Sequence, residues 1–207
     1  MYGVSAREPG VGKWDPTADL DTAVRARVAA VAADIDENRA AITQEIVARL
    51  AARSETPKWD PGLGRMLTAV VEAGIGATVQ MLAHDIAPDQ LSATPLSVEY
   101  VRLLAQRNLP IIAVVTGSNL VDDVVLRWCL ERLEVSDAGA SIVARTTLVV
   151  MTKLAARSER VFQEMLEAYD AERETWLFNR GAARSARLGD ILAGRPCDQA
   201  VAESALG

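Results

Sequence analysis

The chain of 207 residues contains a single histidine, His84, and only two cysteines, Cys129 and Cys197. One imidazole excludes zinc sites and catalytic relays that need two or more histidines. The cysteines lie too far apart to form a disulfide framework or a metal-binding spacing, so we expect a reducing, cytoplasmic setting. The N-terminus lacks a signal-peptide apolar run, and the longest apolar stretch, Leu109 to Val115, is too short to span a bilayer. We therefore expect no contact with a membrane.

Positive charge is also scarce, with 22 Lys and Arg residues against 28 Asp and Glu residues and a net charge of −6. A surface field of this sign repels phosphate backbones, so we expect no direct contact between this segment and nucleic acid. Apolar residues make up half of the chain, which is enough for one well-buried core.

No run of alternating apolar and polar residues enriched in β-branched types is present, so the sequence predicts no sheet. Apolar spacings of three, four and seven residues instead predict an all-α fold. We expect a flexible arm over 1–16, a helical sensory and dimerisation domain over 17–178 and a helical linker over 179–207. The predicted helices are 17–54, 64–84, 97–107, 109–134 and 137–192.

Two of these helices carry features that leave alternatives open. The pattern over 17–54 is too long for one small core, so the helix bends near Asp34 to Asn38, contains a loop there, or pairs with another chain. In a paired arrangement Asn38 would take a heptad core position and fix the register. The apolar helix 109–134, with Pro110 in its first turn and an interruption at Thr116 to Asn119, is expected to be the central core helix.

No constellation of catalytic residues is convincing, and we expect neither an enzyme nor a bound cofactor. His84 follows a predicted helix, where it would complement the helix dipole; the alternative is an axial haem ligand. Cys129 stands beside Trp128 in an apolar run, which is typical of a buried small hydrophobe rather than a reactive thiol. The acidic residues of helix 109–134 have arginines at ion-pair spacing and indicate a solvated face.

Two glycines, Gly74 and Gly76, interrupt the predicted helix 64–84 and form a surface of small residues with Ala73 and Ala77. Glycine inside a helix costs roughly 1 kcal/mol relative to alanine, so this surface indicates a close crossing by another helix. The functional alternative is a ligand pocket beside Gly74 and Gly76, with Trp128 as a further lining residue.

The longest predicted helix carries an apolar stripe with spacings of four, three and seven residues, typical of a coiled-coil seam or a docking face. We expect this stripe to form the contact of a homodimer or of a protein partner. Its residues are Phe162, Leu166, Tyr169 and Trp176.

The end of this helix carries recognisable runs: A-Y-D-A-E-R-E-T-W (168–176), N-R-G-A-A-R-S-A-R-L-G-D-I-L-A-G (179–194) and A-L-G (205–207). They resemble the segment between the N-terminal and central domains of actinobacterial PucR/CdaR-type transcriptional regulators. From Arg27 to Trp176 the layout is similar to the N-terminal domain of RsbR-type stressosome proteins. The resemblance implies a haem-less, globin-like helical domain that dimerises and acts as a sensor. It also implies that the chain continues into a central domain and a DNA-binding helix-turn-helix.

Together these features predict a non-catalytic sensory and dimerisation domain of a transcriptional regulator. Its last helix would relay the signal of an effector or partner to a DNA-binding region. The alternative is a helical carrier or sensor that binds a small molecule or haem.

Overall fold

The structure is a computed structural model that describes residues 16–53, 61–136 and 138–192. These residues form six α-helices and a short 3-10 helix, and none of them lies in a strand, so the all-α class is confirmed. Residues 1–15 of the predicted arm over 1–16, Cys197 and the last residues of the predicted linker lie outside the described residues, whereas Pro16 begins α1. The elements are α1 (Pro16–Glu37), α2 (Arg39–Arg53), α3 (Pro61–Ala83), η1 (Pro88–Gln90), α4 (Pro95–Gln106), α5 (Ile112–Glu134) and α6 (Ala140–Leu192).

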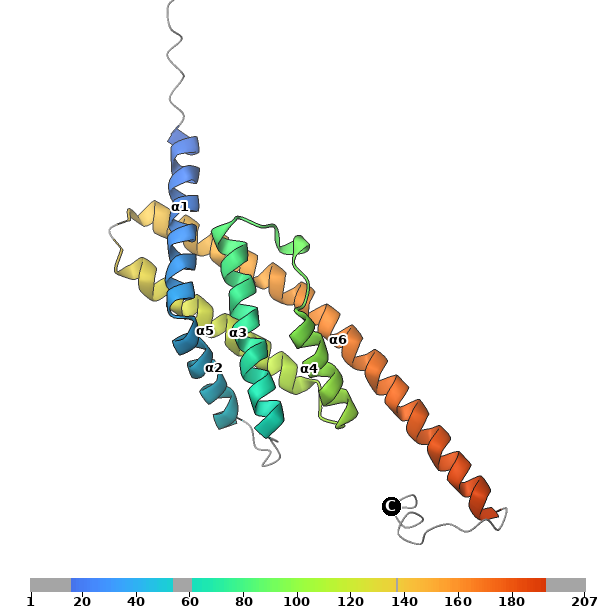
Figure 1. Ribbon diagram of the computed structural model, residues 1–207. Coiled ribbons are helices and arrows are strands. Elements are labelled where there is room, and N and C mark those ends of the chain that lie inside the picture. The colour runs from blue at the N-terminus through green and yellow to red at the C-terminus, as the bar shows by residue number, and fades with distance from the viewer. Residues whose placement is uncertain (1–15, 54–60, 137, 193–207) are drawn as a thin grey trace, which may run out of the picture.

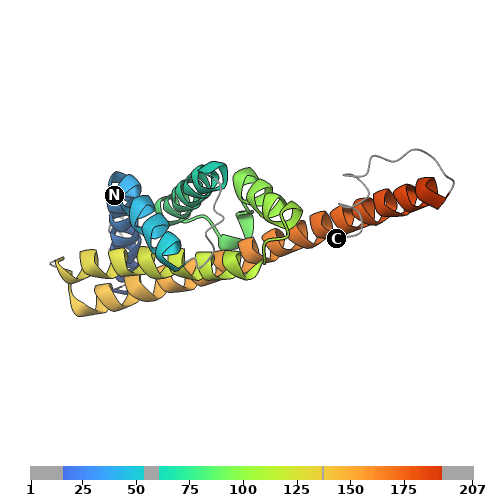
Figure 2. The same cartoon turned by 90° about the horizontal axis from the view of Figure 1, so that it is seen from below.

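The helices form two layers. Figure 2 shows α5 and α6 side by side along the bottom of the view, with α1 to α4 above them on one side only. In Figure 1, α6 runs diagonally past the other helices and continues well beyond them. The faces of α5 and α6 that point away from α1 to α4 are therefore not covered by another helix.

Asn38 separates α1 from α2 and marks a bend in a chain that stays helical on both sides. The Asn38 amide nitrogen donates to the Asp34 carbonyl at 3.1 Å, and Ile42 N donates to the Asn38 carbonyl at 3.0 Å. The Asn38 side-chain Nδ2 donates to the same Asp34 carbonyl at 2.8 Å, a competing bond of the kind that bends helices. The predicted alternatives for this segment were a bend, a loop and pairing with another chain. The structure shows a bend.

The central core helix is α3 rather than α5, so the prediction that gave this role to 109–134 was wrong. α3 lies between α1, α2 and α4, with a smaller contact to α6, and its exposed side carries no large exposed hydrophobic residue. In α5, by contrast, Ile112 and Leu130 are 61% and 41% exposed. The helix itself agrees with the prediction, since α5 is continuous from Ile112 to Glu134 through the polar residues Thr116 to Asn119. The buried residues of α3 are Leu63, Leu67, Val71, Ile75, Thr78, Val79, Met81 and Leu82.

By length and composition α3 could cross a membrane. The sequence prediction missed this helix, because it considered only unbroken apolar stretches. It is the one helix of the described residues that meets this criterion, with a mean hydropathy of 1.5 over its most apolar window. Its apolar side chains nevertheless pack inside the helical bundle, where Ile75 is fully buried. A core helix of this kind meets the same criterion, so α3 is weak support for a membrane segment.

Short polar side chains fix the ends of α3 and α4. Thr94 caps α4 by accepting a hydrogen bond from Ser97 N at 3.1 Å, with Pro95 in the first turn. Asn108 ends α4 in the left-handed region, with φ of 53°, and lets Leu109 N donate to the Leu104 carbonyl at 2.9 Å. Asp85 takes the same conformation after α3, with φ of 52°. These turns place α4 against α6.

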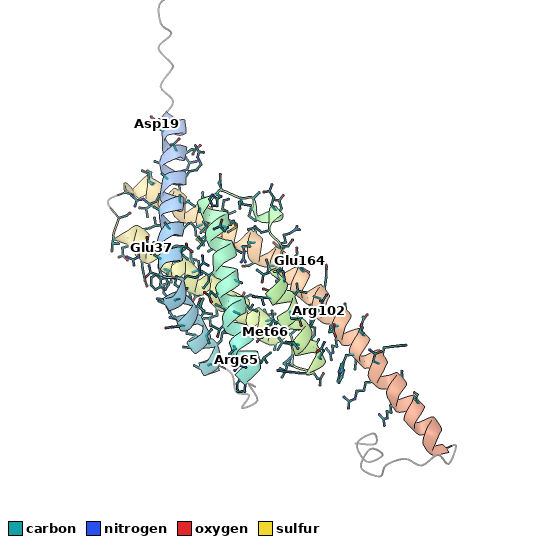
Figure 3. All side chains as sticks on the ribbon, in the orientation of Figure 1. Asp19, Glu37, Arg65, Met66, Arg102 and Glu164 are labelled. Atoms are coloured by element: carbon teal, nitrogen blue, oxygen red, sulfur yellow. The ribbon has the colours of Figure 1, made fainter. Side chains whose placement is uncertain are left out.

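The 53 residues of α6 make a helix about 80 Å long, in close agreement with the predicted 137–192. We call 140–169 the proximal part of α6, because Val150, Leu154, Met165 and Tyr169 are buried against the bundle. We call 170–192 the distal part; Gln106 of α4 donates a hydrogen bond to Glu172 at its start, at 2.9 Å, and Figure 3 shows the helix continuing from there away from the bundle. The helix crosses the predicted domain boundary at residues 178 and 179 without a break.

Candidate functional site

A buried arginine lies on the inner face of α6. Arg157 is 7% exposed although it carries a guanidinium group. Its Nη2 donates to the Gly74 carbonyl of α3 at 3.3 Å, and its Nε is buried with no hydrogen-bond partner in the described residues. Burial lowers the pKa of Arg157, while the nearby Asp122 raises it. A guanidinium group is not deprotonated in proteins at neutral pH, so Arg157 carries a buried positive charge.

Asp122 on α5 supplies the negative charge nearest to this arginine. Burial raises the pKa of Asp122, against the opposing effects of a hydrogen bond with the Ser158 hydroxyl and the charge of Arg157. The two charges act on each other through space, and Ser158 holds the carboxyl from α6. The arrangement is a charge pair in which each group keeps free hydrogen-bonding capacity.

Two cavities adjoin this pair at the junction of α3, α4, α5 and α6. The inner cavity has a volume of about 80 Å³ and the outer one about 340 Å³, and three residues line both: Ser118, Asp122 and Ser158. The inner cavity is bordered further by Val70, Val71, Gly74, Ser97, Val121, Arg157, Val161 and Met165. The outer cavity is bordered further by Val115, Asn119, Ala155, Glu159 and Phe162. We call this set the Arg157 cavity.

The three residues of the predicted ligand pocket are not brought together. Gly74 does line the Arg157 cavity, but Gly76 faces α2, where a Cβ would lie 3.2 Å from Nη1 of Arg39. Trp128 donates its Nε1 hydrogen to Glu45 Oε2 at 3.2 Å and packs at the α2–α5 contact. The predicted close helix crossing is not found at either glycine: the flexible end of the Arg39 side chain takes the space beside Gly76, and a Cβ on Gly74 would meet nothing within 4 Å.

Sequence reasoning missed Arg157, although a signal was present. Arg157 lies three residues after Leu154 and four residues before Val161, so it falls on the apolar face of α6. A charged residue at such a position needs a partner inside the fold. Asp122 was predicted to belong to a solvated face, but it is only partly exposed and lines both cavities.

Two other acidic residues of α5, Asp123 and Glu131, form surface ion pairs. Arg127 pairs with Glu131 at 3.2 Å, as the spacing predicted, and it also bonds to Glu45 of α2. Glu45 accepts further bonds from Arg49 and Trp128. These contacts fasten α2 to α5 and give Trp128 a structural role.

His84 is exposed at the end of α3, on the rim of a groove of about 640 Å³. Apolar residues of α1, α3 and α6 line its floor, and charged side chains such as Arg25 and Arg145 stand at its edge. Arg145 pairs with Asp21 at 3.1 Å across the same groove. The two interpretations of His84, a complement to the helix dipole and a haem ligand, stay predictions.

The predicted docking stripe divides into buried and exposed members. Tyr169 is 2% exposed and donates its hydroxyl hydrogen to the Leu109 carbonyl at 2.8 Å, so it belongs to the protomer's own core. Phe162, Leu166 and Trp176 stay partly exposed. Arg180 covers Trp176, with its guanidinium carbon 5.2 Å from the ring centroid.

Cys129 is 1% exposed, and burial raises the pKa of its thiol to about 12. The prediction of a buried small hydrophobe is therefore confirmed, since the reactive thiolate is strongly disfavoured. Within the residues that the structure describes, no group of three His, Cys, Asp or Glu side chains could hold a metal ion.

One protein family matches the chain. The RsbRD_N family, described as the RsbT co-antagonist protein rsbRD N-terminal domain, matches residues 40–184, which is well over half of the chain. No curated protein and no solved structure shows a significant match. The match confirms the RsbR-type part of the predicted resemblance and covers all of the Arg157 cavity as well as the proximal part of α6. The chain therefore belongs to the family of RsbT co-antagonist rsbRD N-terminal domains, a family of regulatory domains of signalling proteins.

Proposed function

We propose that this chain is a non-catalytic sensory and dimerisation domain that passes a signal along α6 to a DNA-binding region of a cytoplasmic PucR/CdaR-type regulator. The observation that carries the proposal is the dual placement of α6. Its proximal part belongs to the core of the bundle, and its distal part extends beyond the bundle in the same unbroken helix. A rearrangement around the proximal part would therefore move the distal part.

The uncovered side of α5 and α6 supports the dimerisation role. Leu148 and Met151 are 65% and 47% exposed, and they continue the stripe of Phe162 and Leu166 toward the N-terminus of α6 at helical spacing. α5 ends at Glu134, α6 begins at Ala140, and the two helices lie side by side, so they run antiparallel (Figure 2). Exposed α5 residues therefore lie beside this stripe: Leu130 near the level of Leu148, and Ile112 near that of Phe162.

We call this surface the outer face: Ile112, Leu130, Leu148, Met151, Phe162 and Leu166. A contiguous apolar surface on an uncovered helix pair is typical of an interaction site. Two copies of the chain would bury it by pairing α5 and α6 around a two-fold axis, so that four helices meet. Such a contact places the two α6 helices close to each other, which lets a change in their packing pass to both distal parts.

Signal relay requires two arrangements of this helix pair that differ in affinity for the effector or partner. The proximal part contacts α1, α4 and α5, so it responds to changes in either layer of the bundle. At its α4 side, Glu164 Oε2 accepts a hydrogen bond from Ala93 N at 2.7 Å, and Lys153 pairs with Asp85 at 2.9 Å (Figure 3 labels Glu164). These contacts couple the α3–α4 loop to the helix that leaves the bundle.

The outer face is tested by replacing Leu148 and Met151 together with glutamate. Light scattering coupled to size exclusion should show a dimer for the original chain and a monomer for the double variant. The physical reason is that four carboxylates would be buried without partners in the dimer, at a cost of several kcal/mol. Both side chains are exposed in the protomer, so its fold should be unaffected.

Leu96→Glu is the matched control, because Leu96 is a 42% exposed leucine on α4, away from the outer face. This variant should stay a dimer. A chain that is monomeric before any substitution, or a double variant that stays dimeric, would contradict the proposed dimerisation.

A further inference from the structure

The Arg157 cavity has an unmet requirement for a hydrogen-bond acceptor. A guanidinium group has five N–H donors, and Arg157 is buried. In the described part of the chain its recorded hydrogen bond is the one to the Gly74 carbonyl at 3.3 Å, which is long, and its Nε has none. An N–H group without a hydrogen-bond partner costs more free energy on a buried cation than on an exposed one, which water can satisfy. A ligand group that accepts a hydrogen bond from Arg157 would therefore bind favourably.

The cavity limits the size and charge of such a group. A volume of about 80 Å³ beside Arg157 holds a few small polar groups and excludes a bulky phosphate ester. Asp122 also faces this space, and its carboxylate disfavours a ligand with two negative charges. A single planar carboxylate fits both limits, because it accepts two parallel bonds from a guanidinium.

The outer cavity defines the remainder of the ligand. Val115, Ala155 and Phe162 provide apolar walls next to the polar groups that the two cavities share. A short hydrocarbon chain attached to the carboxylate would extend past Ser118 and Ser158 toward these walls. Beyond them Asn119 and Glu159 line the cavity, so a long apolar chain would meet polar groups.

We propose that the Arg157 cavity binds a short-chain monocarboxylate, with its carboxylate on Arg157 and its hydrocarbon chain between α5 and α6. The serine hydroxyls of Ser118 and Ser158 stand beside the carboxylate, and Asp122 sets the selectivity for a single charge. This inference rests on the proposed sensory function and deepens it, since it names the class of effector molecule that the domain would bind. Binding wedges α5 and α6, the two helices that carry the outer face.

The test measures binding of butyrate to the full chain by titration calorimetry, with butyramide as the neutral isostere. Butyrate should bind and butyramide should bind at least about tenfold more weakly, because it lacks the charge that pairs with the guanidinium. Arg157→Met should weaken butyrate binding at least about tenfold. Arg160→Met is the matched control, since Arg160 is an exposed arginine of the same helix that bonds to Glu164 and the Leu91 carbonyl. It should bind butyrate as the original chain does.

Asp122→Asn provides a second variant that does not depend on the stability of Arg157→Met. Asparagine keeps the bond with Ser158 but removes the negative charge beside the ligand, so butyrate should bind several-fold more tightly. Equal affinity for butyrate and butyramide, weaker binding by Asp122→Asn, or no butyrate binding by the original chain would overturn the proposal. The last result would mean that the cavity holds water only.

Binding and dimerisation are measured separately, so the two proposals fail in distinguishable ways. A dimer that does not bind butyrate keeps the proposed dimerisation and loses the ligand. A monomer that binds butyrate keeps the ligand and loses the dimer.

Discussion

The two parts of α6 have the same backbone and opposite surroundings. In the proximal part, Val150 and Leu154 are 0% and 4% exposed, and Arg157 reaches into the bundle. In the distal part, Leu177 and Phe178 are 52% and 76% exposed. The proximal part is held by tertiary packing, whereas the distal part beyond the Gln106–Glu172 hydrogen bond depends on helix propensity and on local pairs such as Trp176 with Arg180.

This difference shows where the helix obtains its stability. An isolated helix of about six turns is marginal in water, because few contacts offset the entropy lost on forming it. In the distal part, Leu177 and Phe178 are adjacent and point about 100° apart around the axis. The distal part therefore needs continuity with the proximal part, and a partner that covered both of these side chains would have to contact more than one side.

Hydrogen exchange should show the largest contrast between the two parts. Amides of residues 146–165 open only with the whole bundle, while those of 177–186 open locally. We expect protection of the proximal amides to exceed that of the distal amides by at least about a hundredfold. Exchange followed by mass spectrometry measures both in one sample.

Concentration serves as the control for this experiment. If the distal parts pair within the proposed dimer, their protection should rise with protein concentration, while that of the proximal part should change little. Equal protection of both parts at every concentration would contradict the contrast.

The second prediction compares the loss of stability when a leucine is shortened in the proximal part and in the distal part of α6. Leu154→Ala should lower the free energy of unfolding by about 2–5 kcal/mol, because it opens a cavity among the core residues. Leu177→Ala removes the same atoms from an exposed position and should change this free energy by less than about 0.5 kcal/mol. Urea denaturation followed by circular dichroism compares the two. Similar losses for both variants would show that the distal part is packed in solution.

The bounds of α6 could be predicted from the sequence. Which of its side chains are buried in the bundle could be predicted only in part. Proline is absent over a long stretch and the apolar spacing is regular, which is enough to define the helix. Tyr169 follows the same spacing as Leu166, yet it packs inside the protomer and bonds to Leu109. Periodicity gives the side of the helix, but it does not show whether another helix of the same chain covers that side.

The ligand site was missed for a related reason. Gly74 and Trp128 are unusual residues in their helices, but they reach different neighbours because α3 and α5 present different faces to the bundle. Arg157 and Asp122 come from α6 and α5, and only the packing of these helices brings their charges together. The position of the bend could be predicted to within a few residues from the sequence, since the polar residue Asn38 interrupts the apolar pattern there. Its side chain bonds to the Asp34 carbonyl in the structure.

The smallest predicted effect concerns the junction between the two parts of α6. Tyr169→Phe keeps the buried ring and removes the hydrogen bond to the Leu109 carbonyl, so it should cost about 1 kcal/mol of unfolding free energy. Tyr100→Phe is the matched control. Burial alone raises the pKa of Tyr100 to about 12, without a contribution from a hydrogen bond, so loss of its hydroxyl should cost less.

Urea denaturation measures both tyrosine variants, and hydrogen exchange shows where the loss occurs. Among the residues of α6 whose burial is described, Tyr169 is the last buried one, and its bond fastens the helix to the turn between α4 and α5. Loss of this bond should extend fast exchange from the distal part toward Met165, whereas Tyr100→Phe should leave the exchange of α6 unchanged. If the two variants lost equal stability and showed the same exchange pattern, the boundary between the parts would not depend on Tyr169, and the apolar contacts of Met165 would have to fix it.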